Sequence, residues 1–131
     1  MKNNIGFILV KPQLGENIGA CARSIKNFGF KKLKLVSPKF TFPNHKTKVT
    51  SVGAYDIIKK TKVFNDIEEA IKEFDIIVSL SARKRDINKK HITFKDFYKI
   101  LSKSKNFNIG LLFGPEASGL SNQDLSYSNY I

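Results

Sequence analysis

Three short segments carry residues whose types and order suit chemistry on a phosphate-containing substrate. The first runs Asn17-Ile18-Gly19-Ala20-Cys21-Ala22-Arg23. The first turn of a helix offers free N–H groups and the positive end of its dipole, so this turn could hold a phosphate. Gly19 weakens a helix, which predicts a close backbone contact there, and Arg23 should face the same end of the sheet one turn further along. The alternative is a helix that merely begins with Asn17 as its cap.

The other two segments are loops that follow predicted strands. One of them reads Ser79-Leu80-Ser81-Ala82-Arg83-Lys84-Arg85. It suggests residues that border a cofactor, next to a patch that binds phosphate, and the alternative is a set of charged side chains that are simply exposed to solvent. Phe113-Gly114-Pro115-Glu116-Ala117-Ser118-Gly119-Leu120 suggests a shaped loop around a ligand, and its alternative is a turn with an exposed acid. A nucleotide-binding α/β protein would need a phosphate-binding loop. This sequence has neither a P-loop ending nor a G-x-G-x-x-G motif after a predicted strand, so that alternative has little support.

Alternating strands and helices must position these segments. Strands are expected at 5–10, 33–36, 62–64, 75–80 and 108–113, helices at 17–28, 49–52, 56–58, 66–73, 93–101 and from Ser121 onward, and an irregular basic loop at 39–48. This order predicts an α/β fold with a parallel sheet flanked by helices. Ligands of such sheets bind beyond the carboxyl ends of the strands, so loops 11–17, 79–90 and 113–121 should form a single cleft.

Length and charge narrow the class of protein. The 131 residues suit one domain, 1–131, and the net charge of +12 favours a polyanionic partner, with nucleic acid first and a membrane surface second. A lysine-rich composition from an A- and T-biased genome would also give this charge. Arginine accounts for only three of the 23 basic residues, Arg23, Arg83 and Arg85. A planar guanidinium can bind a phosphate through two parallel hydrogen bonds, which suggests that these positions need arginine rather than lysine.

Other functions find little support in the composition. Without a long apolar run or a signal peptide, a cytoplasmic protein is expected rather than a membrane protein. Cys21, the only cysteine, is interpreted as a small packed side chain. His45 and His91 lack metal-ligand spacing, so no metal site is predicted.

The first and third segments together resemble the two N-terminal motifs of the SpoU-type RNA 2′-O-methyltransferases, N-x-G-A-x-x-R and F-G-x-E-x-x-G-L. The resemblance covers nearly the whole chain from Ile5 and is closest to the TrmJ group, with Lys26-Asn27-Phe28-Gly29 and Leu120-Ser121-Asn122 as further cues. It implies a SPOUT-like α/β fold with a C-terminal trefoil knot, a homodimer, and S-adenosylmethionine as methyl donor. The implied substrate is the ribose 2′-hydroxyl of tRNA, at the cytidine or uridine in the first anticodon-loop position.

The resemblance also assigns roles by position. Arg23 corresponds to the catalytic arginine, Asn17 supports it, and Glu116 is the motif acid, either structural or at the active site of a dimer. The donor-lining residues are Leu80, Ser81, Ala82 and Gly114. Independently of the resemblance, the positive charge of Arg83, Arg85, Lys89 and Lys90 is expected to add salt-sensitive RNA binding to that of Arg23.

The family's third motif, which forms the knot, should follow the next strand, and the chain stops at Tyr130-Ile131. A fragment, a truncated gene product or half of a split enzyme is therefore expected. The alternatives are a catalytically silent module that still binds RNA, and a ribosomal RNA 2′-O-methyltransferase.

Overall fold

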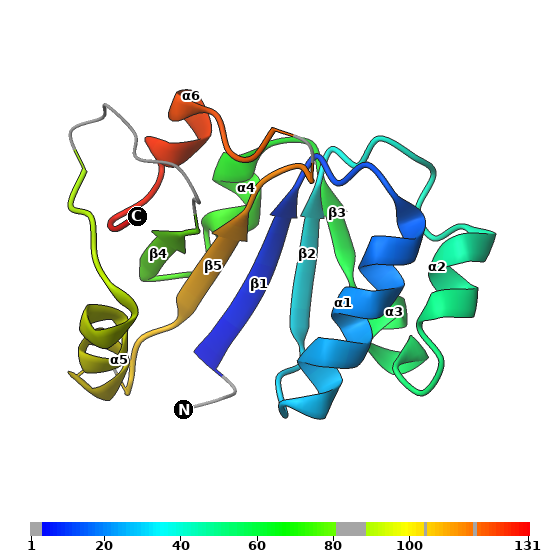
Figure 1. Ribbon diagram of the computed structural model, residues 1–131, viewed down its shortest axis with the longest axis horizontal. Helices are drawn as coiled ribbons and strands as arrows, with labels where there is room; N and C mark the ends of the chain where they lie inside the picture. The colour runs from blue at the N-terminus through cyan, green and yellow to red at the C-terminus, as the bar shows by residue number, and fades with distance from the viewer. Residues whose placement is uncertain (1–3, 81–88, 104, 117) are drawn as a thin grey trace.

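The fold is an α/β sandwich, and the computed structural model describes residues 4–80, 89–103, 105–116 and 118–131 (Figure 1). Its strands are β1 (Ile5–Val10), β2 (Lys32–Val36), β3 (Lys62–Phe64), β4 (Ile76–Ser79) and β5 (Ile109–Phe113). Its helices are α1 (Gly15–Asn27), α2 (His45–Thr50), α3 (Tyr55–Lys60), α4 (Ile67–Ile71), α5 (Phe94–Lys103) and α6 (Asn122–Leu125).

The strands form one parallel sheet in the order β3-β2-β1-β5-β4, which confirms the predicted α/β class. The strand order reverses between β1 and β5, which pair side by side over five positions, from Ile5 with Ile109 to Leu9 with Phe113. A reversal of this kind opens a crevice at the carboxyl ends of the two strands, and ligands of open α/β sheets bind there. The segments that follow β1 and β5 are therefore the first place to look for a site.

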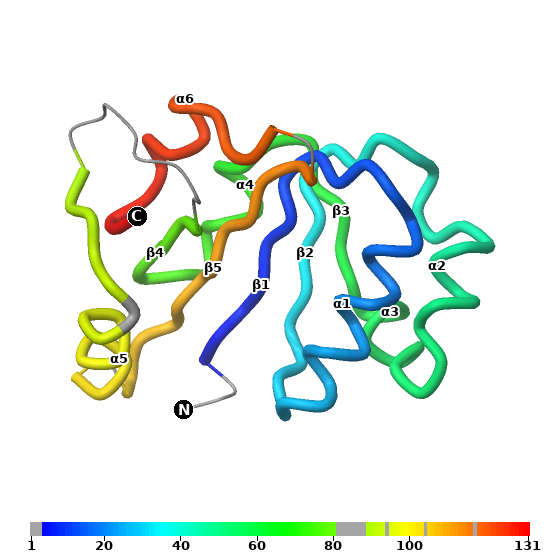
Figure 2. The backbone as a smooth tube through the Cα atoms, viewed as in Figure 1, coloured from blue at the N-terminus to red at the C-terminus, as the bar shows by residue number. Residues whose placement is uncertain are grey.

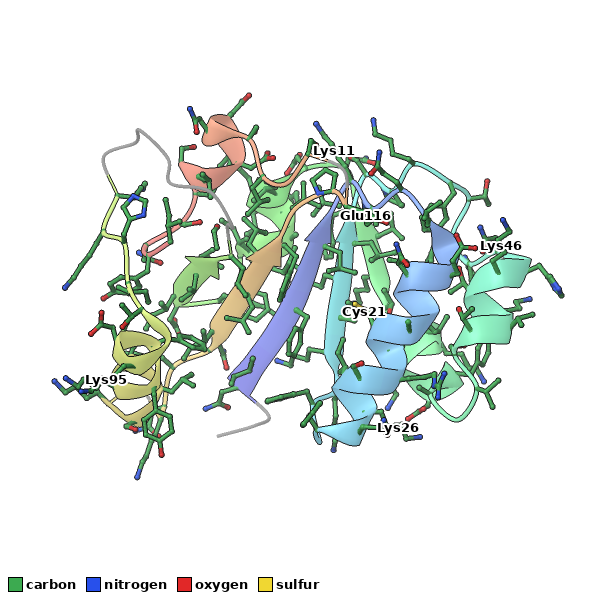
Figure 3. All side chains as sticks on the ribbon, in the orientation of Figure 1. Lys11, Cys21, Lys26, Lys46, Lys95 and Glu116 are labelled. Atoms are coloured by element: carbon green, nitrogen blue, oxygen red, sulfur yellow. The ribbon has the colours of Figure 1, made fainter. Side chains whose placement is uncertain are left out.

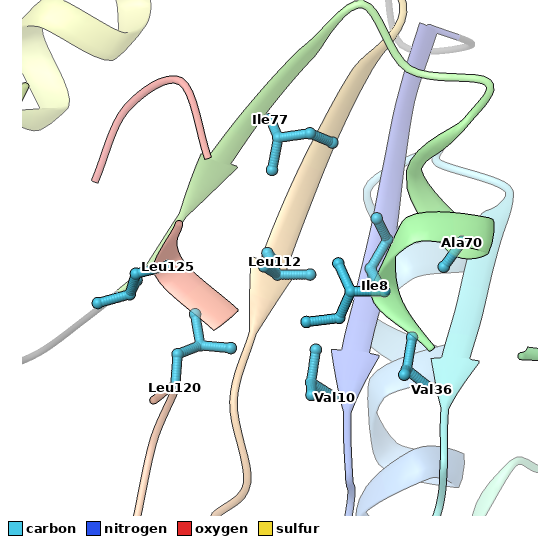
Figure 4. Close-up of a cluster of buried hydrophobic side chains, with 9 residues drawn as sticks. Ile8, Val10, Val36, Ala70, Ile77, Leu112, Leu120 and Leu125 are labelled. Carbon is cyan, nitrogen blue, oxygen red and sulfur yellow. The ribbon is translucent and has the colours of Figure 1, made fainter. Parts of the chain in front are cut away.

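Helices cover both faces of the sheet, so its central strands are apolar on both sides. Helices α4 and α6 lie on one face, where Ile8, Leu112 and Leu125 are fully buried (Figure 4). Helices α1 and α3 lie on the other face over β1 and β2, and α5 packs on that same face over β4 and β5. Figure 2 shows β1 and β5 side by side at the centre of the sheet, with α1 beside β2 and α5 on the side of β4 and β5. In the part of the chain that the structure describes, no helix is long and apolar enough to span a membrane.

Lys34 is an unusual residue on the α4 face, because its side chain is only 13% exposed. Its Nζ donates to the main-chain oxygen of Ala70 at 2.8 Å, pairs with Glu73, and lies over the rings of Phe64 and Phe74. Burial acts to raise the pKa of Glu73, but its contacts with Lys34 and Lys32 outweigh burial and hold that pKa below its usual value. The pair therefore anchors α4 to β2.

The helix boundaries depart from the predictions where a cap or a neighbour decides them. Helix α1 begins at Gly15 rather than Asn17, and its N-cap, Leu14, makes no side-chain cap bond. Part of the expected basic loop is helix α2, which begins because Asn44 Oδ1 accepts a hydrogen bond from the Thr47 N–H at 2.9 Å. The helices expected from Asp66 and from Ser121 do begin there, with each of these residues as the N-cap.

The C-terminal residues lie along the free edge of β4. Tyr130 forms parallel bridges with Val78 and with Lys90, and the Ser79 N–H donates to the Tyr130 oxygen at 3.0 Å. Ser79 Oγ also contacts Ser128 Oγ in the protein interior. This tail therefore covers an edge that would otherwise present unpaired main-chain groups.

Candidate active site at the carboxyl edge of the sheet

Two of the predicted segments meet at the carboxyl ends of β1 and β5, and Glu116 joins them. Its carboxylate accepts hydrogen bonds from the main-chain N–H of Gln13 at 3.0 and 3.2 Å and from that of Leu14 at 3.2 Å. Asn17 Nδ2 donates to the same carboxylate at 2.9 Å. Figure 3 shows Glu116 at this edge, close to the start of α1. The two N–H groups that lead into α1 are thus bound by an anion of the protein itself.

The shape of the loop after β5 places Glu116 there. A Cβ added to Gly114 would come too close to the main chain of Gly119 and Leu120, so the loop can fold back on itself only with glycine at this position. The Gly119 N–H donates to the Pro115 oxygen at 2.8 Å, and Gly119 has a left-handed φ of 71°. Both glycines of the motif therefore serve the turn that presents the carboxylate.

Electrostatics favour the charged form of Glu116. Partial burial acts to raise its pKa, but the hydrogen bonds from Asn17 and from main-chain N–H groups, those of Gln13 and Leu14 included, outweigh burial and hold the pKa below its usual value. The carboxylate is therefore ionised at neutral pH and cannot act there as a general acid. Its position suits it to hold the start of α1.

Asn17 has a different place from the expected helix cap. It lies in the first turn of α1, where its main-chain N–H donates to the Leu14 oxygen at 3.2 Å and its side-chain amide reaches Glu116. The signal for this pairing was present in the sequence, since an amide and a carboxylate occupy the two motifs. Their contact spans 99 residues, so local patterns could not reveal it.

Gly19 provides the close backbone contact that its position in the helix predicted, and the partner is α2. A Cβ at Gly19 would collide with Thr50 Oγ1 and lie 2.8 Å from the Thr47 oxygen. Near the start of α1, Lys46 of α2 pairs with Glu16 at 3.7 Å. Helix α2 therefore lies directly against the first two turns of α1.

Arg23 lies on the flank of α1 that borders α2. It is seven residues after Glu16, and this spacing returns to nearly the same side of a helix. Its side chain is exposed, and within the described residues it makes no hydrogen bond or ion pair. Arg23 is roughly two turns into the helix rather than one, because α1 starts earlier than predicted. A free guanidinium on this flank can bind a phosphate from solvent.

The segment after β4 reaches the same edge of the sheet. The Leu80 N–H donates to the Leu112 oxygen at 2.9 Å, and the Leu80 side chain is 37% exposed beside the end of β5. Ser81, Ala82, Arg83 and Arg85 lie outside the described residues. Lys89 is half-buried and Lys90 is exposed, and the Lys90 oxygen accepts a hydrogen bond from the Ile131 N–H at 3.1 Å.

Comparison with known proteins agrees with this geometry. Residues 4–131 match the model of the SpoU rRNA Methylase family. The chain belongs to this family. Among curated relatives, the tRNA (cytidine-2′-O-)-methyltransferase TrmJ of Methanocaldococcus jannaschii is 33% identical over 92% of this chain and 53% of its own length. The tRNA (cytidine/uridine-2′-O-)-methyltransferase TrmJ of Salmonella typhimurium is 29% identical over 99% of this chain and 54% of its own length.

Solved structures give the same assignment. The crystal structure of TrmJ from Z. mobilis ZM4 superposes with a TM-score of 0.89 at 34% identity, over 96% of this chain and 56% of that one. A more distant SpoU methyltransferase, AviRb from Streptomyces viridochromogenes in complex with AdoMet, shares the fold with a TM-score of 0.69 at 18% identity. This SpoU chain therefore spans about half the length of the curated relatives it matches.

An apolar cavity that the sequence analysis missed lies between α1 and β5 of the SpoU domain. Its volume is about 310 Å³, and its lining consists of Phe7, Leu9, Cys21, Ser24, Ile25, Phe28, Phe30 and Phe113. Phe28 is 69% exposed at its rim. Burial, followed by the charge of Glu116, raises the pKa of the Cys21 thiol, so it stays protonated and acts as a small apolar residue.

Proposed function

We propose that this chain is the N-terminal part of an S-adenosylmethionine-dependent tRNA 2′-O-methyltransferase. The target we propose is the ribose of the cytidine or uridine at the first anticodon-loop position. The observation that carries the proposal is the contact between Asn17 and Glu116, which joins the two SpoU motifs at the point where the strand order reverses. The similarity to the TrmJ tRNA 2′-O-methyltransferases of M. jannaschii and S. typhimurium supports it.

In this proposal, Arg23 acts as a phosphate clamp and not as a general base. A guanidinium remains protonated at any pH the enzyme meets, so it cannot take the proton of the 2′-hydroxyl. It can bind the phosphate beside the target ribose and stabilise the negative charge that develops on the 2′-oxygen. The proton then leaves to phosphate or water. Glu116 and Asn17 hold α1, and with it Arg23, in a fixed position.

The described residues fit one side of a site for the methyl donor. Leu80 offers exposed apolar surface beside the end of β5, and Gly114 begins the neighbouring loop. Leu80, Gly114 and the adjacent Ser81 and Ala82 would hold the donor, which supplies an activated methyl group when bound. The chain's own contribution is alignment of that group with the ribose oxygen, which can supply much of the rate.

We also propose that the whole protein is a cytoplasmic homodimer. The apolar face between α1 and β5, with Phe28 exposed at its rim, suits a contact between two copies. Sedimentation of the longer protein tests this assembly, since Phe28→Ser should shift it toward the monomer. A monomer before any substitution would exclude a homodimer.

The substitution Arg23→Lys tests the catalytic proposal. In a version extended to the relatives' length, transfer of a labelled methyl group to tRNA should fall by about 100-fold, because Lys cannot form the same two-pronged contact with phosphate. Calorimetry should find unchanged binding of the donor. Turnover retained by the variant would refute the role of Arg23. Binding of tRNA with no methyl transfer before any substitution would favour the silent RNA-binding module instead.

A further inference from the structure

We infer that α2 is an RNA-docking element whose exposed lysines hold the phosphate backbone next to the nucleotide bound at Arg23. This inference rests on the proposed function and adds to it a surface of stated chemistry. The residues concerned are Lys46 and Lys48 on α2, with His45 beside them and Lys39 in the preceding loop. None of these residues belongs to the two SpoU motifs.

Packing brings α2 and its loop to the motif helix. The contact at Gly19 sets α2 against the second turn of α1, and the Asn44 side chain packs on Gly15. The loop before α2 is tied to the loop after β1, since the Lys39 N–H donates to the Pro12 oxygen at 2.9 Å. In Figure 3, Lys11 lies at the carboxyl edge of the sheet, and Lys46 lies on α2 beside the upper part of α1. Helix α2 therefore has a fixed position beside the candidate site.

The charge of this region suits a polyanion. Residues 37–53, which include α2 and most of the loop before it, contain Lys39, Lys46 and Lys48 and no acidic residue. By contrast, Asp66, Glu68, Glu69, Glu73 and Asp75 lie on or beside α4, against the opposite face of the sheet. The Lys46 side chain is 70% exposed, and among the described residues its only ion pair is the long 3.7 Å contact with Glu16, so its charge remains available to a ligand. Lys48 is also exposed, on the other side of the buried Thr47.

The spacing between Arg23 and α2 fits nearby phosphates of one RNA strand. Arg23 and Glu16 lie on one flank of α1, and Lys46 contacts Glu16. Seven residues of helix rise by about 10.5 Å, a length that a few nucleotides of one strand can span. A strand whose target ribose lies at Arg23 can therefore place a phosphate of the flanking stem on α2.

A pair of double variants with equal loss of charge tests the inference. Lys46→Gln/Lys48→Gln removes two charges from α2, and Lys59→Gln/Lys60→Gln removes two exposed charges at the end of α3, which leads to the amino end of β3. Fluorescence anisotropy measures binding of this chain to a labelled RNA anticodon stem-loop between 50 and 200 mM salt. The α2 variant should bind about tenfold more weakly, with the slope of log Kd against log salt smaller by about 2, and the α3 variant should change less than twofold.

The remaining outcomes separate the inference from the function on which it rests. Equal weakening by both variants, or by neither, would overturn α2 docking while leaving RNA binding intact. If the unmodified chain bound no RNA, both proposals would fail. Lys46→Arg/Lys48→Arg should bind as the unmodified chain does, and circular dichroism melts of every variant exclude unfolding as the cause. Loss of binding to phosphatidylserine vesicles with unchanged RNA binding would assign the surface to membranes and overturn the inference.

Discussion

Glu116→Gln is the substitution that tests the candidate site most directly. The carboxylate accepts from two main-chain N–H groups and from the Asn17 amide, so both of its oxygens are used. Glutamine keeps one acceptor oxygen but places an NH₂ donor where the second oxygen stood, facing other donors. A hydrogen bond to a charged group contributes about 1.5–3 kcal/mol when it is shielded from water, and exposure of Glu116 reduces this. We therefore expect a loss of about 1 kcal/mol in the free energy of unfolding, or about 4 °C in Tm.

The pH dependence of this loss carries the sharper test. Because the folded state lowers the pKa of Glu116, the stabilisation is complete above the ordinary carboxyl pKa and disappears as the pH falls through the lower, folded value. The difference in the free energy of unfolding between the unmodified chain and Glu116→Gln should therefore be largest at neutral pH and should disappear in strong acid. Urea unfolding followed by circular dichroism at several pH values measures it.

A matched control comes from the same helix turn. Glu16→Gln also removes one negative charge near the start of α1. Within the part of the chain that the structure describes, the Glu16 carboxylate makes only the 3.7 Å pair with Lys46, so the loss of stability should be a few tenths of a kcal/mol. Adding Asn17→Asp to Glu116→Gln lets the new glutamine amide donate to the new aspartate carboxylate. This double variant should recover part of the lost stability. Equal stability of Glu116→Gln and the unmodified chain at neutral pH would refute the anchoring role, as would a difference that persists unchanged in strong acid.

Three further substitutions test the packing around the site by urea unfolding. Gly19→Ala should cost about 1–3 kcal/mol although alanine favours helices, because α2 must move from the Thr47 oxygen, and equal or higher stability would contradict the close contact. Gly114→Ala should cost at least as much, since its Cβ meets main chain on the far side of the loop, and an unchanged midpoint would show that the loop adapts. Lys34→Met keeps the packing but leaves the Ala70 oxygen without its donor, so a loss of about 1 kcal/mol is expected, and no loss would mean that the ion pair only offsets its own desolvation.

Local patterns were sufficient for much of the fold. The apolar run 5–10 predicted β1 with the bounds that the structure has. A strand that is buried on both faces is apolar throughout, so its ends are marked by the first polar residues on either side. The caps at Asp66 and Ser121 also have a purely local cause, a side chain that binds an N–H three residues later. Such features need no knowledge of the tertiary structure.

Helix α2 was misplaced because its stability is not local. His45–Thr50 holds Thr and Val residues that favour helices weakly, and its contact with α1 through Gly19 compensates. The partners of Glu116 were unpredictable for the same reason, since their hydrogen bonds span 99 to 103 residues. The sequence motifs pointed to Asn17 and Glu116, and only the structure showed that the carboxylate of one motif holds the loop of the other. The roles of Leu80 and Arg23 in binding donor and RNA stay predictions.

The separation of charge between the two faces of the sheet has a kinetic consequence. Acidic residues gather at α4 on one face, and Lys39, Lys46 and Lys48 lie in and before α2 on the other, so the two faces differ in charge within a net charge of +12. In the field of a polyanion such a molecule turns as it diffuses, so a larger share of collisions begins with the α1–α2 face forward. Orientation before contact would shorten the search for the target nucleotide.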